Sequence, residues 1–102
     1  MRIIAKKYLV QFWKLHQEAE QPLKSWYDEA VKATWQSPQD IKVQYRNASF
    51  IANNRVIFNI KGNKYRLIVA IAYRFGALYI KFIGTHAEYD KVNAKTVEME
   101  VI

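Results

Sequence analysis

An arginine, a histidine and a tyrosine in the C-terminal half of the chain have the side-chain types that one kind of phosphate chemistry needs. Attack of an RNA 2′-hydroxyl on its own phosphodiester requires a proton acceptor, a cation facing the charged transition state and a proton donor for the departing 5′-oxygen. Arg66 could supply the cation, because a guanidinium binds phosphate through paired hydrogen bonds and stays charged. His86 could supply the proton, and Tyr89 could stack on a base, donate a hydrogen bond or assist proton transfer.

These residue types also occur together in many proteins that cleave nothing, so their surroundings matter. Between Ile41 and Ala87 the chain has eight Lys or Arg residues and no Asp or Glu, and all of the net charge of +7 arises there. Such a lopsided charge predicts a polyanionic partner, which is RNA, DNA, an anionic membrane surface or an acidic protein. A basic surface kept for solubility is the other interpretation, but scattered charge would rarely leave so long a stretch without a carboxylate.

Most of these basic side chains fall within three predicted strands or in the turns between them. Runs rich in Val, Ile, Phe and Tyr lie within 54–90 and are separated by Gly-containing connections at 61–64 and 74–77, which predicts consecutive antiparallel strands. Alternation places Val56, Phe58 and Ile60 on one side of the first strand and Arg55, Ile57, Asn59 and Lys61 on the other. If the apolar sets face the helices, the free face of the sheet would gather Arg55, Asn59, Lys64 and Arg66.

Two amphipathic helices are predicted before the sheet. The first runs from Lys6 to about Glu18, and the second from Pro22, which suits a first helical turn, to about Gln36. The Ser37-Pro38 pair ends the second helix, because proline disfavours helical backbone in the residue before it. The tryptophans could serve as base-stacking platforms. Helical spacing favours core packing for Trp13 and Trp26 and leaves Trp35 open.

The remaining segments complete an α+β arrangement. Residues 39–53 read as a long irregular connection, with room for one short extended or helical turn, and they carry the polar residues Lys42, Tyr45 and Arg46. Residues 2–5 have the composition of a short first strand. We therefore expect an antiparallel sheet, made of the short N-terminal strand plus three C-terminal strands, with the two N-terminal helices packed on one face.

Length and composition predict one small domain. With 102 residues, of which 51% are hydrophobic, the chain can fill one core, and we expect a single domain over 1–102. The absence of Cys excludes disulfides, zinc ribbons and thiol nucleophiles and fits a reducing compartment. The first residues lack the features of a signal peptide, and no apolar run approaches the roughly 20 residues that span a bilayer. A cytoplasmic protein without a membrane partner is expected.

Two motifs of the predicted sheet resemble the HigB family of bacterial type II toxins, within the RelE-like mRNA interferases. The motifs are RVIFNIKGNKYRLIV at 55–69 and FIGTHAEYD at 82–90, with supporting similarity in Trp-Gln-Ser-Pro at 35–38. The resemblance extends over nearly the whole chain in length and element order. It implies a RelE-like toxin that cleaves mRNA, generally on the translating ribosome, with no metal or other cofactor. It also implies silencing by a cognate HigA-like antitoxin, with operator DNA bound only through the antitoxin complex.

The resemblance also implies roles for individual residues. Arg66 matches the arginine that such toxins place on the scissile phosphate, His86 the proton donor and Tyr89 the tyrosine near the reacting nucleotide. The expected RNA-binding residues are Arg55, Asn59, Lys61, Lys64, Arg74 and Lys81. RelE itself has two strand lysines where this chain has Ile57 and Asn59, so the general base stays unassigned.

Four alternatives remain from the sequence. His86 could cap a helix that begins near Ala87 instead of acting in catalysis, and Tyr89 could be a core aromatic. The whole basic surface could serve a non-catalytic RNA- or ribosome-binding module, or a basic adaptor for an acidic protein.

Overall fold

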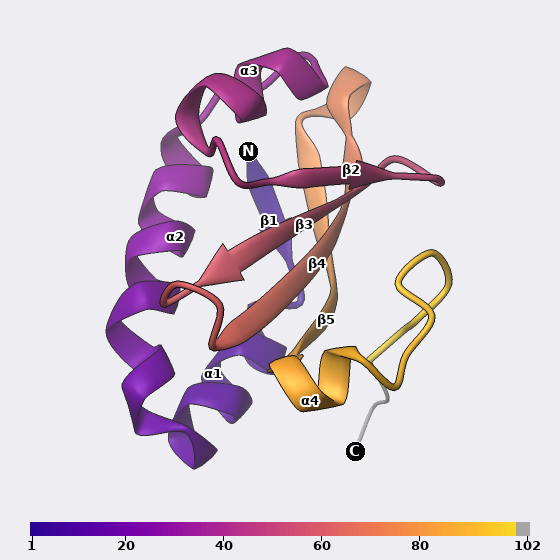
Figure 1. Cartoon of the computed structure of the whole chain (residues 1–102). Helices are drawn as coiled ribbons and strands as arrows, with labels where there is room; N and C mark the ends of the chain where they lie inside the picture. Colours follow the sequence, from indigo (N-terminus) through magenta and orange to yellow (C-terminus); the bar gives the residue numbers. More distant parts are fainter. Residues whose placement is uncertain (100–102) are drawn as a thin grey trace.

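A five-stranded mixed sheet is the centre of the fold in this computed structural model, which describes residues 1–99 (Figure 1). The strand order is β1-β5-β4-β3-β2. Strands β2 to β5 pair antiparallel with their neighbours, whereas β1 runs parallel to β5. Their bounds are β1 (Arg2–Ile4), β2 (Ser49–Ile51), β3 (Arg55–Ile60), β4 (Tyr65–Ala72) and β5 (Ala77–Thr85).

The predicted α+β class and the three consecutive strands β3, β4 and β5 are confirmed, but two details of the sheet were wrong. The N-terminal strand is parallel to its neighbour, because it enters the edge beside β5 and its chain then leaves into a helix across one face. Strand β2 was assigned to the irregular connection. Its hairpin turn uses the left-handed residues Asn53 and Asn54, and such a pair of Asn residues is a recognisable hairpin signal.

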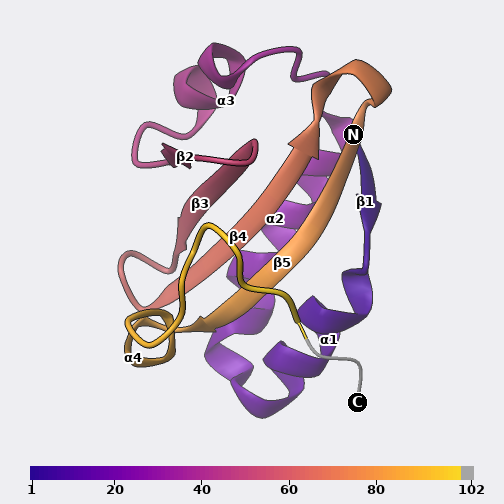
Figure 2. The same ribbon diagram turned by 90° about the vertical axis from the view of Figure 1, so that its right-hand side faces the viewer.

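Two helices cover one face of the sheet, as predicted. They are α1 (Lys6–Leu15) and α2 (Glu20–Lys32), joined by the short 3-10 helix η1 (Gln17–Ala19). Both end a few residues earlier than expected, because the backbone leaves the helical region at His16 and at Ala33. Figure 2 shows α2 behind the sheet. Apolar side chains of both helices are buried in one cluster with side chains of β3, β4 and β5.

The tryptophans belong to this core. Trp13 and Trp26 are buried, which confirms their predicted packing role, and the Trp26 ring meets Phe58 at 5.4 Å between centroids. Trp35, left open by the sequence, is buried as well, and its ring centroid lies 6.2 Å from that of Phe58. All three side chains are therefore used inside the protein.

A third helix, α3 (Pro38–Gln44), lies in the predicted connection. Ser37 precedes it in extended backbone and Pro38 opens its first turn, so the Ser-Pro pair that follows one helix also begins the next. The helix is anchored by Ile41, which is fully buried.

The second face of the sheet is covered, contrary to the expectation of a free face. The helix α4 (His86–Tyr89) and residues 90–99 cross it, and Figure 2 shows this segment in front of β4 and β5. Ile57, Ile68 and Phe82 form a second apolar cluster there. Side chains packed on this cluster include Tyr89, Val92, Val97 and Met99. The parity of the strands was predicted correctly, but the chain's own C-terminal segment covers part of the face that it defines.

None of the helices within residues 1–99 has both the length and the apolar character needed to cross a membrane. A short 3-10 helix, η2 (Tyr73–Phe75), links β4 to β5.

Candidate active site

Arg66 lies near the start of β4, on the face of the sheet opposite α1 and α2. Its register neighbours are Asn59 on β3 and Gly84 on β5. The side chain is half-buried, and its guanidinium donates a 3.3 Å hydrogen bond to the carbonyl oxygen of Asn63. Among residues 1–99 it forms no ion pair with a carboxylate. A half-buried arginine without a carboxylate partner is well suited to bind an anion.

The short helix α4 is fixed at its first residue by a capping box. The Thr85 hydroxyl accepts a hydrogen bond from the Glu88 N–H at 3.2 Å, and the Glu88 carboxylate accepts one from the Thr85 N–H at 2.8 Å. The N–H of His86 donates to the carbonyl oxygen of Lys64 at 3.1 Å, which ties the helix to the β3–β4 turn. Thr85 thus caps the helix, and the His86 imidazole is left for other contacts.

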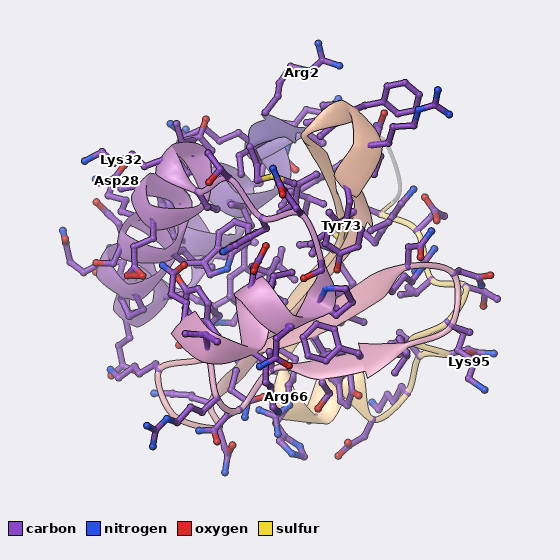
Figure 3. The ribbon with its side chains drawn as sticks, turned by 90° about the horizontal axis from the view of Figure 1, so that it is seen from above. Arg2, Asp28, Lys32, Arg66, Tyr73 and Lys95 are labelled. Carbon is purple, nitrogen blue, oxygen red and sulfur yellow. The ribbon has the colours of Figure 1, made fainter. Side chains whose placement is uncertain are left out.

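The three residues proposed from the sequence for catalysis lie in one cluster. The guanidinium carbon of Arg66 lies 5.7 Å from the centroid of the Tyr89 ring, and the rings of Tyr89 and His86 are 6.4 Å apart. Figure 3 shows Arg66 beside α4. Tyr89 is also half-buried against the second apolar cluster, so its ring has a packing role beside any functional one.

Asp90 joins this cluster, although it was not among the predicted site residues. Its carboxylate lies 3.2 Å from Nδ1 of His86, and both side chains are about half exposed. If Nδ1–H donates to Asp90, then Nε2 is the nitrogen left to face a substrate. The sequence signal for this pair is the four-residue spacing on a helix, which places the two side chains on the same face.

Gly84 allows α4 to lie this close to the sheet. A Cβ atom at this position would come within 2.5 Å of the Phe82 ring and 3.2 Å of the Glu88 Cβ. Any larger residue at this position, directly across from Arg66 in the strand register, would displace the ring or the helix.

The two lysines of the β3–β4 turn share one carboxylate. Glu18, on η1, pairs with Lys64 and lies 3.6 Å from the Nζ of Lys61. All three side chains are exposed, so an incoming phosphate could replace the carboxylate. The sequence places Glu18 about forty residues from these lysines and gave no signal for the contact.

Asn59 lies next to Arg66, as strand parity predicted. Its side-chain amide is 3.4 Å from the Asn63 side-chain oxygen, and Asn63 also accepts the hydrogen bond from Arg66. Asn59, Arg66 and the turn between their strands therefore form one continuous surface.

Arg55 does not join this surface, and its expected convergence with Arg66 on the free face was wrong. Its side chain is 7% exposed, and it donates to the carbonyl oxygens of Ala94 and Val97 and to Glu98 at 2.7 Å. Lys81 binds the other oxygen of Glu98 at 2.8 Å. The hydrogen bond from Lys81, together with Arg55, holds the pKa of the Glu98 carboxyl below its usual value. Both cations thus hold the C-terminal segment on the sheet.

Arg74 is also separate from the cluster. It lies in η2, at the opposite end of β4 from Arg66, and its guanidinium contacts the exposed ring of Phe75 at 5.7 Å.

The described part of the chain has no group of three or more Asp, Glu or His side chains placed to share a metal ion.

Residues 19–92 match the model of a family described as the HigB toxin, the RelE-like toxic component of a toxin–antitoxin system. The chain belongs to the HigB toxin family. This HigB toxin therefore acts within a toxin–antitoxin system, and its family implies a cognate antitoxin as partner. The matched span includes both motifs that suggested the resemblance and every residue of the cluster around Arg66. A comparison with curated proteins finds no match.

Proposed function

We propose that this HigB toxin is an mRNA interferase, an endoribonuclease that cleaves mRNA on the translating ribosome through attack of the 2′-hydroxyl and without a metal. The observation that carries the proposal is the grouping of Arg66, His86 and Tyr89, in which a guanidinium without a carboxylate partner in the described chain faces an aromatic ring next to an imidazole. Toxins of the RelE-like class typically cleave mRNA, which supports this reading.

In the proposed reaction Arg66 binds the scissile phosphate. The 2′-hydroxyl gives up its proton to a general base, a role that stays unassigned among the residues of the cluster. As the 2′-oxygen attacks phosphorus, negative charge grows on the non-bridging oxygens, and a fixed guanidinium stabilises that charge more than it stabilises the ground state. The sheet holds Arg66 between two neighbouring strands, so little reorganisation is needed at the moment of reaction.

His86 protonates the departing 5′-oxygen as the bond between phosphorus and that oxygen breaks. Asp90 acts as a positioning residue, because a carboxylate that accepts from Nδ1–H orients the imidazole and leaves Nε2 to face the substrate. The products of this chemistry are a 2′,3′-cyclic phosphate and a 5′-hydroxyl.

The remaining residues hold the RNA. Tyr89 offers a ring face beside Arg66 on which the reacting nucleotide can stack. Lys61 and Lys64 exchange the Glu18 carboxylate for flanking phosphates. The surplus of positive charge in 41–87 favours binding to ribosomal or messenger RNA. The cognate HigA-like antitoxin silences the toxin, and the complex of the two contacts operator DNA through the antitoxin.

The chemistry of the cut ends tests this proposal. A defined mRNA is translated in a bacterial extract with the purified toxin, and the new ends are sequenced with and without prior 5′ phosphorylation. We expect fragments that can be ligated only after phosphorylation and upstream fragments that end in a cyclic phosphate. Fragments with 5′-phosphate ends would contradict 2′-hydroxyl attack. Arrested translation with intact mRNA would favour the non-catalytic binding module.

A further inference from the structure

A cavity of about 280 Å³ opens beside the cluster around Arg66, at the edge of β3. Strand β2 pairs with β3 only as far as Ile57, so the edge of β3 from Phe58 onward has no strand neighbour there. The end of α3 and the loop after it form the opposite wall, which includes Tyr45, Arg46 and Asn47. We propose that this cavity, here called the α3 pocket, binds one unstacked nucleobase of the mRNA next to the scissile phosphate.

The α3 pocket is connected to the site through side-chain contacts. Asn59 lines the pocket and is the register partner of Arg66 on the neighbouring strand. Asn63 accepts from both of them, with its side-chain oxygen from the Asn59 amide and with its backbone oxygen from Arg66. An RNA strand that places a phosphate on Arg66 therefore has an adjacent base within reach of this cavity.

The walls of the pocket are held in place before any ligand arrives. The Tyr45 hydroxyl donates a 2.7 Å hydrogen bond to Glu29, and its ring packs 5.1 Å from the Phe58 ring. Burial and the bond to Glu29 raise the pKa of Tyr45, so the hydroxyl stays protonated. The ammonium group of Lys42 donates to the Ala48 carbonyl oxygen at 2.8 Å and fixes the loop. A preformed wall reduces the entropic cost of binding.

Two polar side chains in the pocket lining, Arg46 and Asn47, are available to bind RNA. Within residues 1–99 the side chains of Arg46 and Asn47 are exposed and make no hydrogen bond or ion pair, whereas nearby Gln44 is bound at both ends of its amide by Trp35 and Glu29. An amide offers a donor and an acceptor side by side, which matches the edge of a base, and a guanidinium binds a base edge or a phosphate. Asn47 and Asn59 would read the base, and Arg46 would hold the phosphate next to it.

This inference rests on the proposed function only in taking RNA as the ligand, and it is tested by binding instead of cleavage. The isotope-labelled toxin is titrated with four homopolymeric 2′-O-methyl trinucleotides, which cannot be cleaved because the nucleophile is blocked, and with the four nucleoside 5′-monophosphates. Nuclear magnetic resonance follows the backbone signals of residues 46–48 and 59. We expect saturable shifts with at least threefold preference for one base, and tighter binding of the trinucleotide, which also shifts Arg66.

Variants identify the reading groups. Asn47→Ala is expected to lower the affinity for the preferred trinucleotide at least threefold and to remove the base preference. Gln39→Ala, which removes an exposed amide on α3 but outside the α3 pocket, should change neither. Arg46→Ala should weaken all four trinucleotides similarly, whereas Arg2→Ala, on the opposite side of the molecule from Arg66 in Figure 3, should not.

Two results would contradict the binding of a nucleobase in the α3 pocket. One is the absence of saturable shifts at 46–48 and 59 with every trinucleotide, and the other is an unchanged base preference in a folded Asn47→Ala variant. Either result in a toxin that cleaves mRNA leaves the interferase function intact. Base-selective binding by a toxin that cleaves no mRNA would support the α3 pocket as a base-binding site and contradict the interferase function.

Discussion

The guanidinium of Arg66 faces the ring of Tyr89, with 5.7 Å between the guanidinium carbon and the ring centroid, although the two residues belong to different elements. Arg66 comes from β4, whereas Tyr89 ends the four-residue helix that Thr85 and Glu88 cap. The contact therefore depends on the angle at which α4 leaves β5. The contact also orients the Arg66 guanidinium, because a cation is attracted to the face of an aromatic ring.

The ring of Tyr89, and not its hydroxyl, is expected to carry this function. Tyr89→Phe keeps the ring beside Arg66 and should retain cleavage within about threefold. Tyr89→Leu keeps an apolar side chain on the second cluster but loses the ring, and should lower the cleavage rate about tenfold, which corresponds to about 1.4 kcal/mol. The initial rate of cleavage of a defined mRNA in a translation extract is measured for both variants. An equal loss in the two variants would instead assign the function to the hydroxyl.

Arg55 and Arg66 should differ in what they contribute to stability. Arg55→Ala removes hydrogen bonds to two backbone carbonyl oxygens and to Glu98, and should lower the free energy of unfolding by about 2 to 3 kcal/mol. Arg66→Ala loses one long hydrogen bond and the contact with Tyr89, and should change it by less than about 1 kcal/mol. Urea unfolding at neutral pH measures the free energy of unfolding of both variants and of the wild type. A similar loss in both variants would mean that Arg66 is a structural residue.

Which of these features the sequence could predict depends on the range of the interaction. Alternation along β3 and β4 placed Phe58 and Leu67 toward the helices and Asn59 and Arg66 on the other face, because strand geometry fixes this locally. The same parity placed Arg55 on the same face as Asn59. Arg55 differs from Asn59 because its guanidinium binds residues 94–98. This irregular segment lies about forty residues away in the chain, and its path has no periodic sequence signal. The partnership of Asp90 with His86, in contrast, was readable from helical spacing.

The C-terminal segment should loosen in acid through Glu98. Because Lys81 and Arg55 lower the pKa of Glu98 in the folded protein, the unfolded chain takes up a proton at higher pH. The contribution of Glu98 to stability is therefore complete above the ordinary glutamate pKa of about 4.3 and is lost as the pH falls through the lowered value.

Glu98→Gln tests this pH dependence. Since Glu98 is largely exposed, the variant should be less stable than the wild type by only about 1 kcal/mol at pH 7, and the difference should shrink toward pH 3. Asp28→Asn is the matched control, because Asp28 is exposed on α2 and forms no ion pair in the described chain. A stability difference that stays constant between pH 7 and pH 3 would contradict the assignment.

Glu18 should compete with RNA for the lysines of the β3–β4 turn. Glu18→Gln frees Lys61 and Lys64, and we expect affinity for an uncleavable RNA to rise about two- to fivefold at low salt, with a steeper dependence on salt. The control is Glu20→Gln, which breaks the exposed pair with Lys24 on α2. Fluorescence anisotropy measures the binding. Equal effects of the two variants would show a response to net charge alone.

Induction in bacteria tests whether the cluster of Arg66 and His86 cleaves mRNA. The wild type, Arg66→Ala and His86→Ala are induced in parallel while growth is followed and mRNA 5′ ends are mapped. We expect growth arrest with new 5′ ends inside coding regions for the wild type, and a loss of both in each variant. Equal arrest by all three proteins without new ends would mean that toxicity comes from binding, and would contradict the catalytic assignment.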